Sequence, residues 1–418
     1  MQFFGTTMFA ILLLTMGTFL AGNSKEVVTF IEKTSSMSAS VFFTQSTTAT
    51  QLRTTFKAVP ETKKKLRILL VPGHEPNFGG AEYLDIKERD LNADLALILA
   101  RYLVEDGHYE VAMTRGKDGW NPDFQNYFTA KDEEIKAFVR SQKMEMVRLI
   151  EEGKVFKMSK QAPHNAAQSD VALRLFGINK WANDHQIDMV IHIHFNDSFP
   201  RKPTLPGEHN GFTIYTPEYQ YSNSQATAEI AKNIFKRLAR MFPVSSLPKE
   251  DQGVVEDQDL IAVGNSNSVD AASMVIEYGY IYEPQLRTPD VRRLALKELA
   301  FQTYLGLADF FGEASLVAGS HGSTLLPYEG NTPVKKTSLA NAEVFALQAA
   351  LIDKGFYPPS GYTRNACPLS GLLGPCTRAA LDAFQYKFGI KDERGVVGEK
   401  TRAELRKLFQ PNLMSVRR

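Results

Sequence analysis

Short apolar runs alternate along this chain with longer stretches in which apolar residues recur every three or four positions. The runs predict buried strands, and the periodic stretches predict amphipathic helices. The expected strands cover 66–71, 109–114, 189–194, 211–215 and 271–280. The expected helices cover 91–103, 172–183, 224–241 and 292–311. Strands that alternate with helices are typical of a mostly parallel, twisted sheet with helices on both faces, so the sequence predicts an α/β fold.

The N-terminal segment 1–22 carries no charged side chain and has an apolar centre over 9–14. Small residues follow at Ala21 and Gly22, and this pattern predicts an export signal that is cleaved. An apolar stretch of this length also suits a retained membrane anchor. We therefore expect a secreted protein of the periplasm or cell envelope, with membrane anchoring through the N-terminus as the alternative.

Two segments of different composition divide the rest of the chain. Residues 23–65 are rich in Ser and Thr without a sustained period, which predicts a linker. Residues 313–341 turn to Gly, Ser, Pro and Thr and predict a second linker. We therefore expect a main domain over 66–312, with an insert at 116–165, and a small domain over 342–410.

The expected C-terminal domain contains a near-repeat. Residues 371–381 and 395–405 each have a G-x-x-G turn followed by the start of a helix. Pro375 stands at the favoured first position of its helix. Gln348 and Gln385 each follow a large apolar residue ahead of one of the turns. The pattern predicts a small helical domain.

Four side chains with metal and acid-base chemistry stand at the ends of the expected elements. His74 follows the first strand, and Glu88 lies just ahead of Asp90, a residue type that can cap the next helix. His194 ends a later strand, and Glu277 stands near the end of the last one. Two His and one Glu form a common catalytic Zn²⁺ set, and a further Glu suits the general base.

These residues belong to a series of motifs that resembles the zinc-dependent N-acetylmuramoyl-L-alanine amidases of bacterial peptidoglycan, in the same order along the chain. The motifs are Pro72-Gly73-His74-Glu75, Glu88-Arg89-Asp90-Leu91-Asn92, Thr114-Arg115, His192-Ile193-His194-Phe195-Asn196 and Ile276-Glu277-Tyr278-Gly279-Tyr280. Three positions depart from the family pattern, because Glu75 replaces a Gly, His192 a Ser and Phe195 an Ala.

The resemblance implies a cell-wall hydrolase that cleaves the amide between N-acetylmuramic acid and L-alanine. His74, Glu88 and His194 would hold Zn²⁺, and Glu277 would be the catalytic acid and base. The C-terminal repeat resembles the three-helix peptidoglycan-binding module often joined to wall hydrolases, which implies a small three-helix domain, so both domains are expected to bind peptidoglycan. Two alternatives remain: a zinc endopeptidase or carboxypeptidase acting on wall peptides, and a wall-binding protein without activity.

Three further residues near these motifs are candidates for a supporting role. His192 faces the same side of its strand as His194 but lies deeper, so we expect it to support a ligand through a hydrogen bond rather than to bind the metal. Glu75 and Asn196 flank the two histidine ligands and are candidates for the same role or for substrate contact.

Charge and cysteine content narrow the picture further. The formal net charge is +1 and no basic stripe is present, so we expect no nucleic-acid partner. The chain has two cysteines, Cys367 and Cys376, in one loop of the C-terminal domain. Because export leads to an oxidising compartment, we expect a disulfide between them, with two free thiols as the alternative.

The insert at 116–165 has no counterpart in the family pattern. Thr129 and Asp132 have capping-box spacing, and Ile135 and Leu149 belong to one apolar helical face. We consider two positions for this amphipathic helix: a lid over the cleft, on which an activator protein could act, or an ornament packed on the flank of the sheet.

Overall fold

The computed structural model describes residues 46–158, 167–313, 322–330, 334 and 339–409. The expected signal or anchor at 1–22 lies outside the described residues. Within the described ranges, no helix combines the length and the apolar character needed to cross a membrane.

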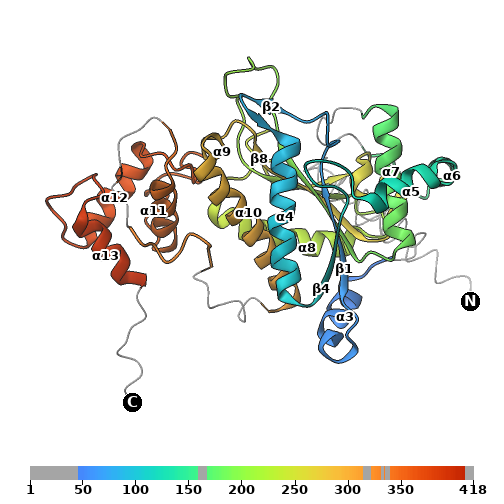
Figure 1. Ribbon diagram of the computed structural model, residues 1–418, viewed down its shortest axis with the longest axis horizontal. Coiled ribbons are helices and arrows are strands. Elements are labelled where there is room, and N and C mark those ends of the chain that lie inside the picture. The colour runs from blue at the N-terminus through green and yellow to red at the C-terminus, as the bar shows by residue number, and fades with distance from the viewer. Residues whose placement is uncertain (1–45, 159–166, 314–321, 331–333, 335–338, 410–418) are drawn as a thin grey trace, which may run out of the picture.

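A six-stranded sheet forms the centre of the main domain (Figure 1). Its strands are β1 (Leu66–Pro72), β4 (Tyr109–Met113), β5 (Met189–Asn196), β6 (Thr213–Pro217), β7 (Val254–Asp257) and β8 (Ala272–Tyr280). Their order across the sheet is β4-β1-β5-β8-β6-β7. The first four of these run parallel, whereas β6 is antiparallel to β8 and parallel to β7. The expected α/β fold with a mostly parallel sheet is confirmed.

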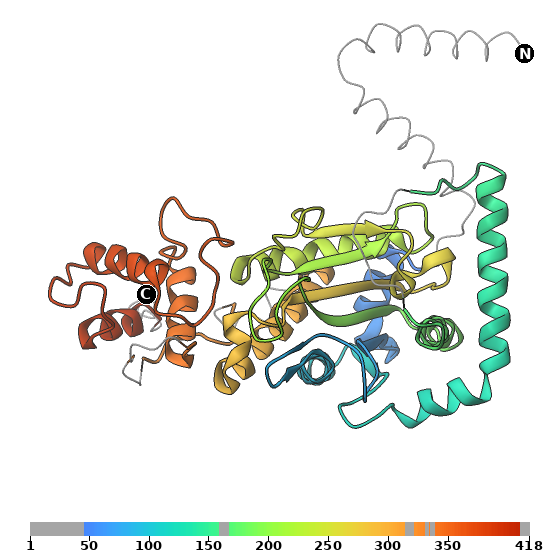
Figure 2. The same cartoon turned by 90° about the horizontal axis from the view of Figure 1, so that it is seen from above.

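Helices cover both faces of this sheet (Figure 2). These helices are α4 (Glu88–Asp106), α8 (Ser224–Met241) and α10 (Pro289–Phe311) on one face and α7 (Ser169–Asp184) on the other. Alternate residues of β1 enter the two cores: Ile68 and Leu70 pack in the first, and Leu69 and Val71 in the second. Because both faces are buried, β1 is almost continuously apolar, as a central parallel strand requires.

Short elements complete the main domain. They are the hairpin strands β2 (Glu82–Tyr83) and β3 (Ile86–Lys87), the 3-10 helices η1 (Ile261–Val263) and η2 (Asn265–Asn267), and α9 (Pro284–Arg287). β7 was not predicted because two of its four residues are acidic, so its apolar run is too short to indicate a strand.

The segment expected as an N-terminal linker contains a helix. This helix, α3 (Ala49–Thr62), begins at Thr48, whose side chain accepts a hydrogen bond from a backbone N–H of the first turn. Leu52, Phe56 and Val59 are buried against the main domain. The linker prediction is wrong here because three apolar side chains at helical spacing are a weak sequence signal, and tertiary packing supplies the stability.

The insert forms two helices at the edge of the main domain, α5 (Pro122–Ala130) and α6 (Asp132–Glu151) (Figure 2). The expected capping box is wrong, because the Thr129 hydroxyl donates to a backbone carbonyl of α5 and Lys131 separates the two helices. α6 packs against α7 and η2 through the apolar face that the sequence indicated. This position matches the second expectation, an ornament on the flank of the sheet.

The C-terminal domain consists of α11 (Ala342–Asp353), α12 (Pro375–Lys387) and α13 (Glu399–Phe409). Its near-repeat has a structural basis in two buried glutamines, Gln348 and Gln385. Each carboxamide accepts a hydrogen bond from the first Gly of a G-x-x-G turn and donates one to the Thr of the following helix. The bonds are Gly371 to Gln348, Gln348 to Thr377, Gly395 to Gln385 and Gln385 to Thr401, each 2.8 Å long.

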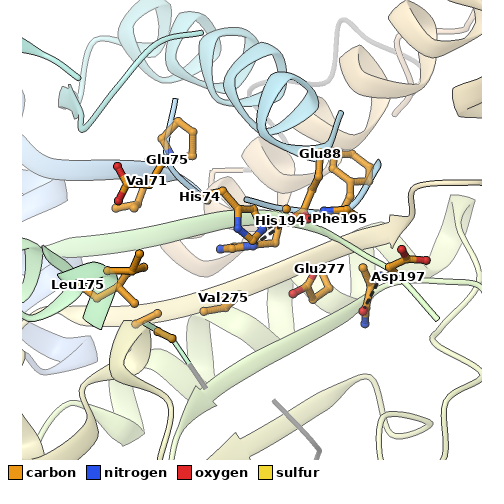
Figure 3. A pocket seen from close by; sticks show the side chains of 18 of the residues that line it. Val71, His74, Glu75, Glu88, Leu175, His194, Phe195, Asp197, Val275 and Glu277 are labelled. Carbon is orange, nitrogen blue, oxygen red and sulfur yellow. Dashed lines mark hydrogen bonds and ion pairs between the residues drawn. The ribbon is translucent and has the colours of Figure 1, made fainter. Parts of the chain in front are cut away.

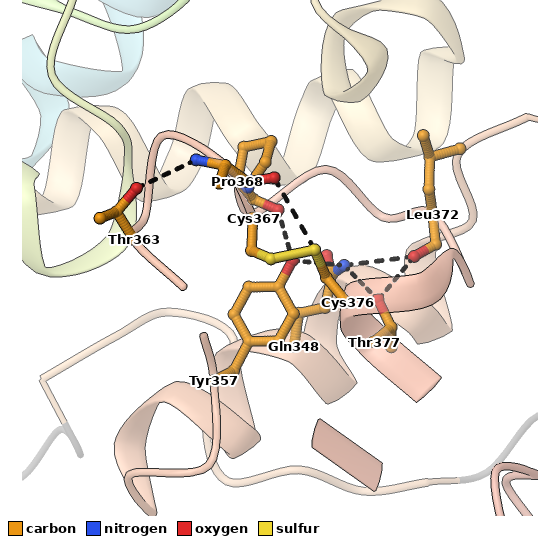
Figure 4. Close-up of a disulfide and its surroundings, with 9 residues drawn as sticks. Gln348, Tyr357, Thr363, Cys367, Pro368, Leu372, Cys376 and Thr377 are labelled. Atoms are coloured by element: carbon orange, nitrogen blue, oxygen red, sulfur yellow. Dashed lines mark hydrogen bonds between the residues drawn. A yellow bond between two sulfur atoms is a disulfide. The ribbon is translucent and has the colours of Figure 1, made fainter. Parts of the chain in front are cut away.

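A disulfide joins Cys367 and Cys376 across the first of these turns (Figure 4). Their Cα atoms are 5.8 Å apart, which is an ordinary separation for a disulfide. Beside it, the Tyr357 hydroxyl donates to the Pro368 carbonyl at 2.8 Å. The disulfide therefore closes a loop that the turn and the tyrosine already hold in place.

The C-terminal domain is docked on the main domain. Phe345 and Leu369 belong to the same buried cluster as the helices α8 and α10. At the edge of this contact, the Asn365 side chain donates to the Val244 carbonyl at 2.8 Å. An apolar core that continues from one domain into the other holds their relative orientation more firmly than a flexible linker would.

Candidate functional site

The first part of the site is the loop that follows β1. Gly73 lies so close to the His194 ring that a Cβ atom at this position would stand 2.1 Å from it, so only glycine fits. His74 follows with a φ of 68°, in the left-handed region that few residues other than glycine adopt. The loop is therefore shaped to turn the imidazole of His74 back toward β5.

Arg115, which follows β4, holds this loop. Its guanidinium is buried and donates to the carbonyl oxygens of Pro72 at 3.1 Å and His74 at 2.8 Å. It also donates to the carbonyl oxygens of Gly73 and Arg89. The sequence motif that contains this arginine does not reveal its role, because an isolated Arg at a strand end gives no sign that carbonyl groups will enclose it.

Glu88 provides the second part of the site. It is the first residue of α4, with Lys87 in the cap position, so the expectation that Asp90 caps this helix is wrong. Its buried carboxylate accepts hydrogen bonds from the backbone N–H groups of Ala81, at 2.8 Å, and Phe195, at 3.2 Å. These bonds connect the glycine-rich loop, α4 and β5 around one side chain.

The third part, His194 on β5, completes a compact cluster (Figure 3). Oε1 of Glu88 lies 2.8 Å from Nε2 of His74 and 3.1 Å from Nδ1 of His194. All three ligand atoms lie within 4.8 Å of one another, and in the described part of the chain no other group of His, Cys, Asp and Glu has this arrangement. Two imidazoles and a carboxylate directed at one point fit a divalent metal ion.

The protonation states favour metal binding. Burial alone would raise the pKa of Glu88, but the adjacent His74 and His194 hold that pKa well below its usual range. Burial lowers the pKa of His194, which favours the neutral imidazole. A metal site needs an ionised carboxylate and neutral imidazoles, and the shifts of Glu88 and His194 both favour the form that binds metal.

Glu277 on β8 lies beside this cluster without being one of the three converging ligands (Figure 3). Its Oε2 atom is buried and has no hydrogen-bond partner among the described residues. Burial raises the pKa of Glu277 well above its usual range, and the carboxylates of Glu88 and Glu250 raise it further. A carboxylate in this environment binds a proton readily, which suits a general base.

A cavity of about 700 Å³ surrounds these side chains. The metal cluster lies near its middle, with Glu75 and Leu175 toward one end and Asp197 toward the other (Figure 3). A volume of this order accommodates a ligand larger than a single amino acid. One wall of the cavity is formed by α7, with Arg174 and Leu175. None of the described residues of α6 lines the cavity.

Glu75 connects three segments at its end of the cavity. Its carboxylate accepts hydrogen bonds from Nε of Arg174 at 2.6 Å and from the indole N–H of Trp120 at 3.0 Å. Arg174 also pairs with Asp170 one turn earlier on α7, at 2.9 Å. Trp120 and Arg174 were not predicted as site residues, because 45 and 99 positions separate them from Glu75 in the sequence.

The two remaining candidates occupy different environments. His192 is fully buried beneath the cluster, and its Nε2 atom has no hydrogen-bond partner among the described residues. Burial, together with the charge of His194, lowers the pKa of His192 to about 3, so it is a neutral side chain. Asn196 lines the cavity and accepts a hydrogen bond from the Asp197 backbone N–H at 2.8 Å.

Comparisons with known protein families give two matches. The family model of N-acetylmuramoyl-L-alanine amidases matches residues 68–294, and that of a peptidoglycan-binding domain matches residues 340–405. No curated protein matches the chain.

Similar solved structures include the amidase Ami1 of Mycobacterium smegmatis, with 17% identity, 59% of this chain and 97% of that chain covered, and a TM-score of 0.38. The amidase CwlD of Clostridioides difficile, solved in complex with the GerS lipoprotein, has 16% identity, 59% and 98% coverage and a TM-score of 0.38. The catalytic domain of CwlV from Bacillus (Paenibacillus) polymyxa has 16% identity, 60% and 99% coverage and a TM-score of 0.35.

The amidase model covers more than half of the chain, including all three members of the metal cluster and Glu277. The expected enzyme class and its extracytoplasmic, cell-wall substrate are thereby confirmed. The chain belongs to the N-acetylmuramoyl-L-alanine amidase family, a family of hydrolases that act on peptidoglycan, and it carries a C-terminal peptidoglycan-binding domain.

Proposed function

We propose that Zn²⁺ is the ion held by His74, Glu88 and His194. Two imidazoles and one carboxylate leave a fourth position for water or substrate, and this set is common at catalytic zinc sites. When bound, zinc lowers the pKa of a water molecule and polarises a carbonyl oxygen. The observation that carries the proposal is the convergence of three ligand atoms within 4.8 Å at the centre of the cavity.

Glu277 is the acid and base of the reaction in this proposal. As the water oxygen attacks the lactyl carbonyl carbon, the Glu277 carboxylate takes a proton from the water. It then gives this proton to the nitrogen of L-alanine while the C–N bond breaks, which leaves a lactyl carboxylate and a free peptide amine. The buried, raised-pKa environment of Glu277 supports this role, and general acid-base catalysis contributes roughly 100- to 10,000-fold in rate.

Arg115 and Glu75 position the loop of the metal ligand His74 in this proposal and do not bind the substrate. Arg115 fixes the carbonyl groups on either side of His74 and therefore fixes the direction of the imidazole. Glu75 holds the wall formed by α7 against the same loop. His192 fills the space beneath His194 as a neutral side chain, and Asn196 lines the cavity beside the ligands.

We propose that residues 1–22 direct export and are removed, that 66–312 is the catalytic domain and that 342–410 is the wall-binding domain. The cell-wall substrate of the family supports an export route. N-terminal sequencing of the protein recovered outside the cytoplasm tests the first part. An intact N-terminus at Met1 would indicate a retained anchor instead.

The insert supplies a surface for a protein partner in this proposal. Met144 and Val147 on α6 are apolar side chains that are 69% and 52% exposed. Changing both to Ser is expected to leave hydrolysis of a soluble substrate unchanged and to weaken the action of an activator in cells. Equal wall digestion in cells by this variant and by the original enzyme would contradict the proposal.

One digest tests the catalytic assignment. Purified peptidoglycan is incubated with the enzyme with and without a chelator, and the products are identified by mass spectrometry. We expect stem peptides with a free L-alanine amine, glycan strands without peptides and no products after chelation, together with about one zinc per chain by elemental analysis. Fragments cut within the stem would favour the endopeptidase alternative, and another metal at full occupancy would overturn the choice of zinc.

A further inference from the structure

A buried arginine organises the end of the cavity that lies opposite Glu75. Both oxygens of Asp197 accept hydrogen bonds from the guanidinium of Arg201, at 2.5 and 2.7 Å. Nη2 of Arg201 also donates to the Glu82 carbonyl on β2 at 2.8 Å. The two charged side chains are only 4% and 7% exposed, so this loop is fixed to the β2–β3 hairpin by a paired, desolvated contact.

Three aromatic rings surround the same guanidinium. The ring centroids of Tyr83, Tyr282 and Phe199 lie 5.3, 5.6 and 5.7 Å from its central carbon. The two tyrosines are buried, whereas Phe199 is 73% exposed although it lines the cavity. Cation-π contact with a buried, paired arginine holds the exposed ring in place before any ligand arrives.

The two ends of the cavity differ in the groups that they offer a ligand. At the Phe199 end, Asp197 is paired with Arg201, and Glu82 is paired with Arg89 at 2.8 Å. This end therefore offers an aromatic face and the amide of Asn196 rather than a free charge. A sugar ring has the matching chemistry, because it is uncharged, has an apolar C–H face that can stack on an aromatic ring, and carries hydroxyl and amide groups at its edges.

The opposite end suits the other half of the substrate. Arg174 lines the cavity and is 28% exposed, and its Nη1 group has no hydrogen-bond partner among the described residues. A guanidinium that retains a donor can bind a carboxylate, and a peptide stem carries carboxylates whereas a glycan of neutral sugars does not.

We infer that the cleft is a polarised site in which Phe199 stacks on a sugar ring of the glycan strand and the stem peptide runs from the metal cluster toward Arg174. The inference rests on the amidase reaction, because that reaction places a sugar on one side of the scissile amide and a peptide on the other. The loop 197–201, which no family motif includes, thereby becomes the element that recognises the sugar.

Two soluble substrates test the sugar site. One is a disaccharide that bears the stem peptide, and the other is the same stem acylated with lactate, which keeps the scissile amide but lacks every sugar ring. For Phe199→Ala we expect the preference for the disaccharide substrate, measured as the ratio of the two kcat/KM values, to fall about tenfold, mainly through KM. Phe199→Trp should restore the preference, since an indole also presents a stacking face.

Phe156→Ala is the matched control. Phe156 is another exposed phenylalanine of the main domain, 42% exposed, and it is absent from the cavity lining. This variant should keep the original preference. An unchanged kcat/KM ratio in Phe199→Ala, or an equal loss of kcat/KM for both substrates, would overturn the sugar site. The exposed ring of Phe199 would then be assigned to contact with a protein partner. If the original enzyme released no peptide from the disaccharide substrate, the amidase assignment itself would fail, and the two failures are therefore distinguishable.

Discussion

His194 and Glu277 occupy paired positions on the neighbouring parallel strands β5 and β8. Parallel strands in register bring side chains at the same level to the same edge of a sheet, so the proposed metal ligand His194 and the proposed acid-base group Glu277 stand side by side without help from a loop. If these roles are correct, Glu277 is already beside the metal cluster before substrate binds.

The first prediction separates the roles of these two residues. Glu277→Gln should keep its metal and lose at least about 100-fold in kcat, because an amide cannot take the proton from water. His194→Ala should lose both metal and activity. Elemental analysis and kinetics on the same preparations measure both effects, and a metal-free Glu277→Gln protein would show that Glu277 is a ligand.

The second prediction concerns Glu75, which replaces the usual glycine of the family pattern. Glu75→Ala should lower the free energy of unfolding by about 2 kcal/mol, because Arg174 and Trp120 lose a buried hydrogen-bond acceptor. Asp170→Asn is the matched control, since it removes the solvent-exposed partner of the same arginine and should change stability little. Chemical denaturation measures the free energy of unfolding of both variants. Equal losses would mean that the bonds of Glu75 to Arg174 and Trp120 add no stability.

The third prediction concerns the disulfide. Replacing Cys367 with Ala and Cys376 with Ser should destabilise the C-terminal domain by roughly 2 to 3 kcal/mol, the loop entropy expected for a bridge across nine positions. Thiol titration of the unreduced protein should detect no free thiol. Two reactive thiols in protein recovered from outside the cell would contradict the pairing in that compartment.

The fourth prediction is a pH dependence of stability that does not involve the metal ligands. Burial, together with the charge of the nearby Glu256, raises the pKa of Glu218, which follows β6, from 4.5 to about 7. Because the folded pKa lies above the unfolded one, the stabilising effect of the protonated carboxyl is complete below about pH 4.5 and is lost as pH rises to about 7. The loss amounts to roughly 3 kcal/mol.

Glu218→Gln should remove this slope. Unfolding free energies of the original protein and the variant, measured between about pH 4.5 and 8, should diverge steadily across the window. Glu61→Gln changes a glutamate of α3 that is exposed to solvent, and this control should run parallel to the original protein. Parallel curves for Glu218→Gln as well would contradict the raised pKa.

The sequence was sufficient for five of the six strands and for the cluster because these depend on local signals. A continuous apolar run such as 66–71 predicts a strand buried on both faces, and the residue that leaves such a strand lies at the edge where ligands bind. His74, His194 and Glu277 were identified in this way, and Glu88 was identified by its place at the start of a helix. Family motifs then limited the chemistry that this set could perform.

What the sequence did not indicate depends on contacts between distant positions. Arg201 meets a tyrosine of the β2–β3 hairpin, and Arg174 meets Glu75, only after the chain has folded. α3 was missed for a related reason, since its three buried side chains gain their stability from the main domain rather than from helix propensity. The antiparallel direction of β6 was also not expected, because strand direction depends on the path of the whole connection.

The apolar core shared by α10 and Phe345 has a consequence for the enzyme on the wall. If a flexible linker joined the two domains, the catalytic domain could move around the bound C-terminal domain and cleave all stem peptides within the length of the linker. Here the shared core fixes the wall-binding domain relative to the catalytic domain. Each time the C-terminal domain binds peptidoglycan, the catalytic site is therefore held at one orientation and one distance from the point of binding. Stem peptides at that distance from the bound domain should be cleaved first. Digestion should then continue only after the whole enzyme dissociates and binds again at another place.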